Sequence, residues 1–251
     1  MDAVTALALI GAGLAAGALN TLAGGGSLIL LPALMLAGSS ATHANATSRI
    51  AILAQCLVGA ATFARGGRLP TAAARAVVPP VIVGAAIGAY VATQVSNRVF
   101  TPILLATLGA MALALLVDPR RLSPPADATP RAATGLLPGL GLLAAGFYGG
   151  LLQAGAGLVF LAIFAGGLRY DVVRANALKA LVMLLYIAVT VAVFIAYDMI
   201  AWRAGLVVAV GAALGAWGAA RLAMTTHGPR ITRIVVVAAV VALIAVMISR
   251  L

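Results

Sequence analysis

The sequence has few charged residues and almost no cysteine or histidine. Only 8% of its 251 residues are charged, whereas soluble globular chains carry about 25%. Cys56 is the single cysteine, so no disulfide can form within the chain. His43 and His227 stand far apart and leave no cluster of metal ligands. We therefore expect no metal site and no cofactor.

Acidic residues are scarcer than basic ones, with 5 against 16 and a net charge of +11. All five fall at the ends of apolar segments or in loops, and they are Asp2, Asp118, Asp127, Asp171 and Asp198. A cation transporter is therefore disfavoured, because no carboxylate is placed to bind Na⁺ or carry a proton in a membrane. The sequence contains no H-E-x-x-H motif, acid–base pair or Ser-His-Asp set, so we expect no enzyme. No basic run alternates with aromatic residues, and no nucleic-acid partner is expected.

Hydrophobic residues are abundant, at 64% of the chain with a mean hydropathy of +1.16. Several apolar segments approach or reach the roughly 20 residues that span a bilayer. We predict an all-α polytopic membrane protein whose first helix is not cleaved, because no basic region precedes it. The predicted helical segments are 3–22, 27–37, 44–64, 73–93, 99–117, 134–153, 157–168, 174–197, 202–222 and 231–249.

Two glycine-containing breaks interrupt the apolar runs. The first is Gly24-Gly25-Gly26-Ser27, and the second, weaker one is Gln153-Ala154-Gly155-Ala156-Gly157. Each glycine costs a helix interior about 1 kcal/mol relative to alanine, so three together predict a helix break. Within hydrocarbon, a broken backbone is tolerated only where protein buries it or where it lines a cavity. The breaks are candidate binding sites; the alternative is that the glycines only allow close helix packing.

The halves of the chain on either side of a polar linker resemble each other. Ala44-Asn45-Ala46 matches Ala175-Asn176-Ala177, and Asn45 follows Gly25 by 20 residues while Asn176 follows Gly155 by 21. We predict a first transmembrane repeat at 1–117, a polar linker at 118–133 and a second repeat at 134–251.

The short segments after the breaks decide the predicted topology. Segments 27–37 and 157–168 are roughly 17 Å long as helices, about half a bilayer. If each broken region crossed the membrane once, the arginines of loops and tails would divide almost evenly between the two sides of the membrane. If each break is the tip of a re-entrant hairpin, one side holds most of them and satisfies the positive-inside rule. That side then holds Arg65, Arg68, Arg75, Arg120, Arg121, Arg131, Arg169, Arg174, Arg221, Arg230 and Arg233, against Arg98, Arg203 and Arg250 on the other. We predict two inverted repeats, each with a broken, re-entrant helical hairpin plus three spanning helices, and both termini non-cytoplasmic.

In this arrangement the two breaks meet near the membrane centre, and the helices beginning at Ser27 and Gly157 point their N-termini at the meeting point. Two helix N-termini favour an anion, because each presents free amides and a partial positive charge. The predicted substrate-binding residues are Gly24, Gly25, Gly26, Ser27, Asn45, Thr47, Ser48, Arg49, Gln153, Gly155, Gly157, Asn176 and Lys179. Alternatives remain: Arg49 and Lys179 could extend to lipid headgroups, the asparagines could bond other helices, and Gln153 could tie its break to a neighbour.

The glycine-rich break, the short apolar helix with Pro32 and the Ala44-Asn45-Ala46-Thr47-Ser48 stretch, repeated after a linker, resemble the sulfite exporter TauE/SafE family of bacterial membrane permeases. The resemblance covers residues 10–250, although Ala154 and Ala156 replace glycines in the second copy. It implies export of sulfite or small organosulfonates, such as sulfoacetate, across the inner membrane. An anion channel, or a permease for another small organic anion, is the alternative. The expected partners are a small anion, the lipid bilayer and, as one option, a second copy in a homodimer.

Overall fold

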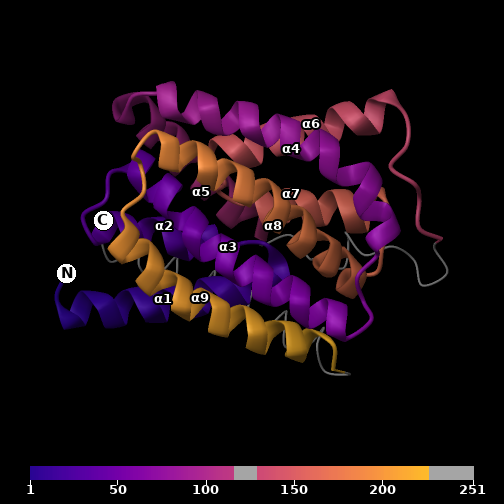
Figure 1. Cartoon of the computed structure of the whole chain (residues 1–251), viewed down its shortest axis with the longest axis horizontal. Coiled ribbons are helices and arrows are strands. Elements are labelled where there is room, and N and C mark those ends of the chain that lie inside the picture. The colour runs from indigo at the N-terminus through magenta and orange to yellow at the C-terminus, as the bar shows by residue number, and fades with distance from the viewer. Residues whose placement is uncertain (116–128, 226–251) are drawn as a thin grey trace.

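The computed structural model describes residues 1–115 and 129–225, and these residues form helices and connecting loops without a strand (Figure 1). The first half contains α1 to α5, and the second contains α6 to α9 with one π-helical segment. Their bounds are α1 Ala3–Ala23, α2 Ser27–Leu36, α3 Ala41–Arg65, α4 Thr71–Gln94, α5 Asn97–Leu115, α6 Leu136–Leu151, α7 Ala156–Leu161, the π-helix Ala162–Gly167, α8 Val172–Ala196 and α9 Trp202–Ala223.

These helices agree closely with the segments predicted from hydropathy. Every predicted helix within the described residues is present, and its ends differ by no more than three residues when α7 and the π-helix that continues it are counted as one segment. The predicted helix 231–249, residues 118–128 of the linker and His227 lie outside the described residues. An all-helical fold is therefore confirmed.

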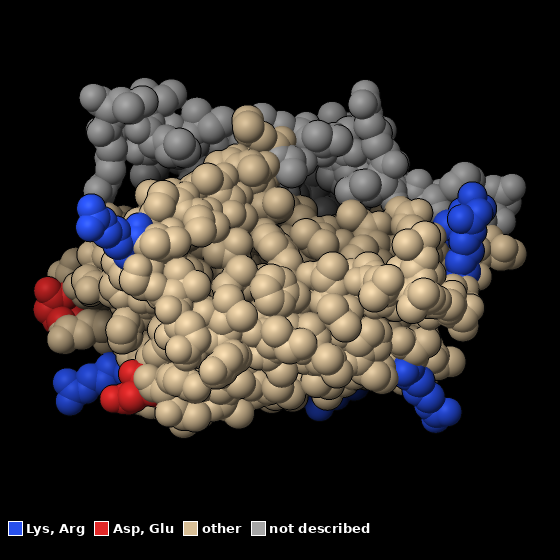
Figure 2. All heavy atoms as spheres, turned by 90° about the horizontal axis from the view of Figure 1, so that it is seen from above, with Lys and Arg blue, Asp and Glu red and all other residues tan. Residues whose placement is uncertain are grey.

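Five of the described helices, α1, α3, α4, α8 and α9, are long and apolar enough to cross a membrane. Most charged side chains visible in Figure 2 lie towards the two ends of the molecule, and the face between them is a broad, largely uncharged belt. Such a belt is what the hydrocarbon of a bilayer requires. The chain is a multi-pass membrane protein.

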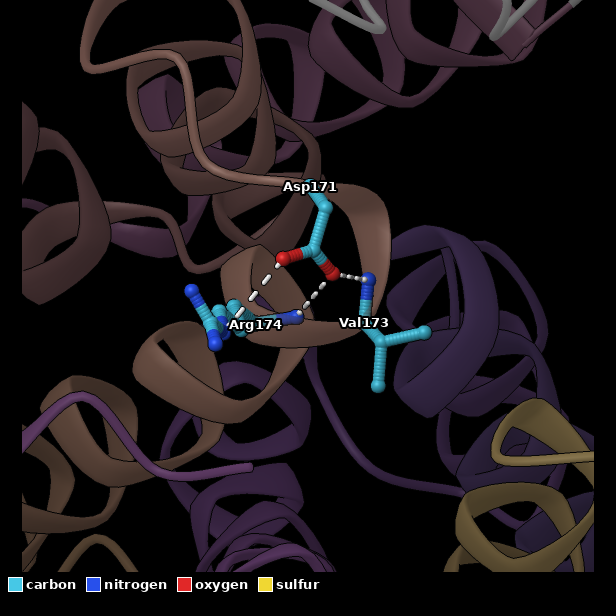
Figure 3. Close-up of polar contacts among 3 residues, drawn as sticks. All are labelled: Asp171, Val173 and Arg174. Carbon is cyan, nitrogen blue, oxygen red and sulfur yellow. Dashed lines mark hydrogen bonds and ion pairs between the residues drawn. The ribbon is translucent and has the colours of Figure 1, made fainter. Parts of the chain in front are cut away.

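Polar side chains cap several helices at the ends of this belt. The carboxylate of Asp171 accepts hydrogen bonds from the amides of Val173 (3.1 Å) and Arg174 (3.0 Å), and it pairs with the Arg174 side chain at 3.6 Å (Figure 3). Asp2 caps α1 in the same way by accepting from the Thr5 amide at 2.7 Å. Aspartate suits these positions because its oxygens satisfy amides that have no partner inside the helix.

Helices from one half of the chain pack along helices from the other half. α1 lies along α9, and α6 lies along α4, so each half contributes a helix to the other's bundle (Figure 1). Glycines permit these close contacts: a Cβ at Gly17 would lie 2.8 Å from Cα of Ala212, and one at Gly146 would lie 2.8 Å from Cα of Val81. Close backbone approach through small residues is typical of membrane helices. Between the two bundles, α3 packs against α8.

The chain folds back on α1 after the first break. A Cβ at Gly26 would lie 2.6 Å from Cβ of Asn20, and α2 packs against α1. The residues that begin α2 thus return along the helix they have just left, as a hairpin requires. The inverted relation of the two repeats, their placement in the membrane and the repeat boundaries remain predictions.

Candidate functional site

The two helix breaks meet, as predicted. Gly24 lies against the first turn of α7, where a Cβ on it would be 2.5 Å from the carbonyl oxygen of Gly157. A Cβ on Gly157 would in turn be 2.7 Å from Cα of Gly24 and from Oδ1 of Asn20. The amide of Gly155 donates a hydrogen bond to Oγ of Ser27 at 2.7 Å. The N-terminal ends of α2 and α7 therefore touch.

Both breaks use the left-handed backbone region. Gly24 has φ of 81° and Gly155 has φ of 69°. Glycine adopts this region readily because it has no Cβ. Gln153 also lies there, with φ of 58°, although it carries a long side chain. Such a residue costs on the order of 1–3 kcal/mol and persists only where its surroundings hold it.

Arg49 of α3 holds the carbonyl end of α6, directly before the second break. Its side chain is fully buried, and its guanidinium donates to the carbonyl oxygens of Gly149 (2.8 Å) and Gly150 (2.6 Å). One turn earlier on α3, Nδ2 of Asn45 donates to the carbonyl oxygen of Leu151 at 3.0 Å. Three consecutive carbonyls at the end of α6 are thus satisfied by two side chains from the other half of the chain. We call this set the Arg49 clamp.

Lys179 and Asn176 of α8 form the corresponding Lys179 clamp at the end of α1, before the first break. Nζ of Lys179 donates to the carbonyl oxygen of Asn20 at 2.7 Å and to Oδ1 of Asn176 at 2.6 Å, and it lies 3.4 Å from the carbonyl oxygen of Thr21. Nδ2 of Asn176 donates to the carbonyl oxygen of Leu22 at 3.2 Å. Three acceptors around Nζ match the three protons of an ammonium group.

Both clamps place a cation at a helix C-terminus, where unpaired carbonyls carry partial negative charge. With exposed fractions of 0% for Arg49 and 2% for Lys179, neither side chain reaches lipid headgroups, so that alternative is wrong. The alternative that the asparagines bond other helices is confirmed, since Asn45 bonds α6 and Asn176 bonds α1. Each clamp joins the two halves of the chain at the helix end that precedes one of the breaks.

The other predicted residues divide into two groups. Oε1 of Gln153 accepts from Arg49 at 3.1 Å, so Gln153 ties the second break to α3. Thr47 points elsewhere: its Oγ1 accepts from the amide of Ala201, at the start of α9, at 3.0 Å. Ser48 donates to the Asn45 carbonyl within its own helix at 2.8 Å. Thr47 and Ser48 therefore position α3, whereas the remaining predicted residues surround the two breaks.

Four buried polar residues close to this site or on its helices were not among the predicted residues. The hydroxyl of Tyr186 donates to Gln153 at 3.1 Å, Thr190 lies 3.4 Å from the Arg49 guanidinium, and Asn20 contacts Gly157. Gln55, further along α3, is 3% exposed, and its Oε1 has no partner in the described part of the chain. The available signal was a single polar residue inside an otherwise apolar segment, which by itself does not indicate what that residue contacts.

The electrostatics of the site favour an anion. Arg49 and Lys179 are the buried charged side chains among residues 1–115 and 129–225, where Asp2, Asp171 and Asp198 are not buried. Burying these charges costs free energy, and nearby carbonyl dipoles offset part of it. The ring of Phe194 also contributes, because its centroid lies 5.1 Å from the Arg49 guanidinium carbon. Within the described residues, no group of three or more His, Cys, Asp or Glu could hold a metal ion.

Comparisons with known proteins identify relatives along nearly the whole chain. The family model described as "Sulfite exporter TauE/SafE" matches residues 9–247. A curated protein of Sinorhizobium sp., "Probable membrane transporter protein ORF9", is 27% identical over 227 residues, which cover 90% of this chain and 85% of that protein. No solved structure matches the chain.

Proposed function

The chain belongs to the sulfite exporter TauE/SafE family, and from this membership we propose that it is a secondary transporter that exports small anions such as sulfite or organosulfonates. Its membrane fold and the curated transporter relative support transport rather than catalysis. The observation that carries the proposal is the meeting of two helix breaks beside two buried cations.

The anion binds where the two breaks meet. The N-terminus of α2 has no side-chain cap, and neither does that of α7. The amide of Gly155, which donates to Ser27, and the partial positive charges of both helix ends become available to an anion once the two breaks separate. Glycine at the contact lets the backbone approach a ligand closely. In this proposal the binding residues are Gly24, Gly25, Gly26, Ser27, Gln153, Gly155 and Gly157.

The clamps act around this contact. Arg49 with Asn45, and Lys179 with Asn176, hold the carbonyl ends of α6 and α1 and add positive charge close to the bound anion. Charges act more strongly in a site without water than on a surface, because the local dielectric is lower. Thr47 and Ser48 contribute by positioning α3.

The proposed setting is the bacterial inner membrane, with the binding site at the membrane midplane and both termini on the non-cytoplasmic side. The uneven distribution of arginines in the predicted loops supports this orientation, because positive loops remain in the cytoplasm.

Flux measurements in proteoliposomes test the proposal. We expect the full chain to exchange [³⁵S]sulfite against internal unlabelled sulfite with saturable kinetics, and other small sulfonates to compete. A channel would pass anion current without counterflow. If the inserted, folded chain neither exchanges nor conducts sulfite, sulfonates, sulfate or thiosulfate, the proposal is wrong.

A further inference from the structure

The two clamps differ in how completely their polar atoms are used. In the Lys179 clamp, Oδ1 of Asn176 accepts from Nζ of Lys179 at 2.6 Å, and Nδ2 donates to Leu22. In the Arg49 clamp, Oδ1 of Asn45 and Nε of Arg49 are buried and have no partner among the described residues. Buried polar atoms are nearly always paired, so each exception needs an explanation.

The difference follows from the spacing of the clamp residues. Lys179 follows Asn176 by three residues, and its ammonium group reaches back to Oδ1 of Asn176. Arg49 follows Asn45 by four residues, and its terminal nitrogens are occupied by the carbonyl oxygens of Gly149 and Gly150. One acceptor and one donor therefore remain open in the Arg49 clamp.

The two atoms belong to side chains of one clamp on α3. Residues four apart share one face of a helix, and Asn45 and Arg49 donate hydrogen bonds to three consecutive carbonyl oxygens at the end of α6. Gln153, which Arg49 also contacts, lies in the second break. The clamp that carries the open pair therefore adjoins the second break. Its exposed fraction is 1% at Asn45 and 0% at Arg49, so bulk water does not satisfy it.

We propose that this open pair recognises the substrate and selects an oxyanion that carries a proton, such as hydrogen sulfite, over a sulfonate or a fully deprotonated oxyanion. Nε of Arg49 donates to a charged oxygen of the anion, while the anion's hydroxyl donates to Oδ1 of Asn45. A sulfonate has no hydroxyl on its sulfonyl group, so its oxygens would face the lone pairs of Oδ1 without a hydrogen bond. The inference rests on the proposed function and specifies its substrate class.

Inhibition of [³⁵S]sulfite exchange provides the test. The full chain is reconstituted in proteoliposomes at a mildly acid pH, where hydrogen sulfite predominates, and the inhibitors are unlabelled hydrogen sulfite and methanesulfonate. We expect the unaltered chain to prefer hydrogen sulfite. Asn45→Ala should weaken inhibition by hydrogen sulfite about 2- to 10-fold more than inhibition by methanesulfonate, a difference of the size of one hydrogen bond.

Asn176→Ala is the matched control. It removes the same kind of bond to a helix carbonyl, from Asn176 to Leu22, but it removes no open acceptor. Inhibition by hydrogen sulfite and inhibition by methanesulfonate should therefore change by the same factor. Arg49→Lys keeps the charge but lacks Nε, and it should also reduce the preference for hydrogen sulfite. The preference of the unaltered chain is itself a test that needs no variant to fold.

Equal inhibition of the unaltered chain by both anions would overturn the inference. So would an Asn45→Ala chain that shifts both anions alike, or neither, because Asn45 would then only position α6 or hold a water molecule. Absence of any anion exchange by the folded, unaltered chain would instead overturn the proposed function, and the inference would fall with it.

Discussion

Gly24→Ala should separate the two helix breaks. The new methyl group would lie 2.5 Å from the carbonyl oxygen of Gly157, and backbone atoms of α7 cannot rotate away as a flexible side chain could. The breaks would have to move apart, and the 2.7 Å hydrogen bond between Gly155 and Ser27 would lengthen. We therefore expect loss of both stability and transport.

The expected cost has two parts. The φ of 81° at Gly24 is left-handed, which costs an alanine about 1–2 kcal/mol. Inserting a methyl group into a closely packed contact costs about 1–3 kcal/mol. Together they amount to roughly 2–5 kcal/mol, a large share of the 5–15 kcal/mol that typically stabilises a folded protein.

Alanine substitutions at two other glycines separate the backbone contribution from the packing contribution. Gly38 has φ of 98°, but a Cβ on it would have no neighbour within 4 Å among the described residues, so Gly38→Ala should cost only the backbone part. Gly17 has no positive φ but lies against Ala212, so Gly17→Ala reports on packing away from the breaks. Thermal unfolding in detergent measures stability, and exchange of [³⁵S]sulfite in proteoliposomes measures transport. If Gly24→Ala unfolds at the same temperature as Gly38→Ala and transports normally, the breaks do not meet as described.

Three further predictions concern topology, the clamps and a cap. A reporter of sidedness fused at Leu251 should lie outside the cytoplasm and one in the linker 118–131 inside; a cytoplasmic C-terminus would contradict the hairpin topology. Arg49→Met and Lys179→Met should each destabilise the chain by about 1–3 kcal/mol for every buried carbonyl left unpaired, measured by thermal unfolding, and unchanged stability would show that the clamps are not formed. Asp171→Ala should cost about 0.5–2 kcal/mol as a lost helix cap without changing sulfite affinity, and an altered affinity in the exchange assay would place the start of α8 in the transport path.

Much of the fold could be predicted because an apolar segment that lies in the hydrocarbon of a bilayer favours a helix. A backbone in a bilayer must satisfy its own hydrogen bonds, and a helix does this within one segment. The apolar runs therefore predicted the described helices within three residues at their ends. The glycines at 24–26 and the Gln153–Gly157 stretch predicted the breaks, since a helix interior tolerates such residues poorly.

The partners of the polar residues could not be predicted in the same way. The spacing of Asn45 and Arg49 placed them on one face of α3, but it did not decide between the substrate, the headgroups and, for Asn45, another helix. The structure shows that both side chains bond the carbonyl end of α6, which lies about 100 residues further along the chain. Tyr186 and Thr190 were missed for the same reason, because their contacts depend on how α8 lies against the second break and against α3.

The sequence by itself determined the helices, the breaks and the absence of buried carboxylates from the apolar segments, because local composition decides what a bilayer accepts. Only the tertiary structure decided that α1 packs with α9 and α6 with α4, so that each half of the chain supplies the clamp for the other half's broken helix. The physical reason is that a carbonyl at a helix end needs a donor, and nothing in a chain's local pattern states which distant side chain will provide it.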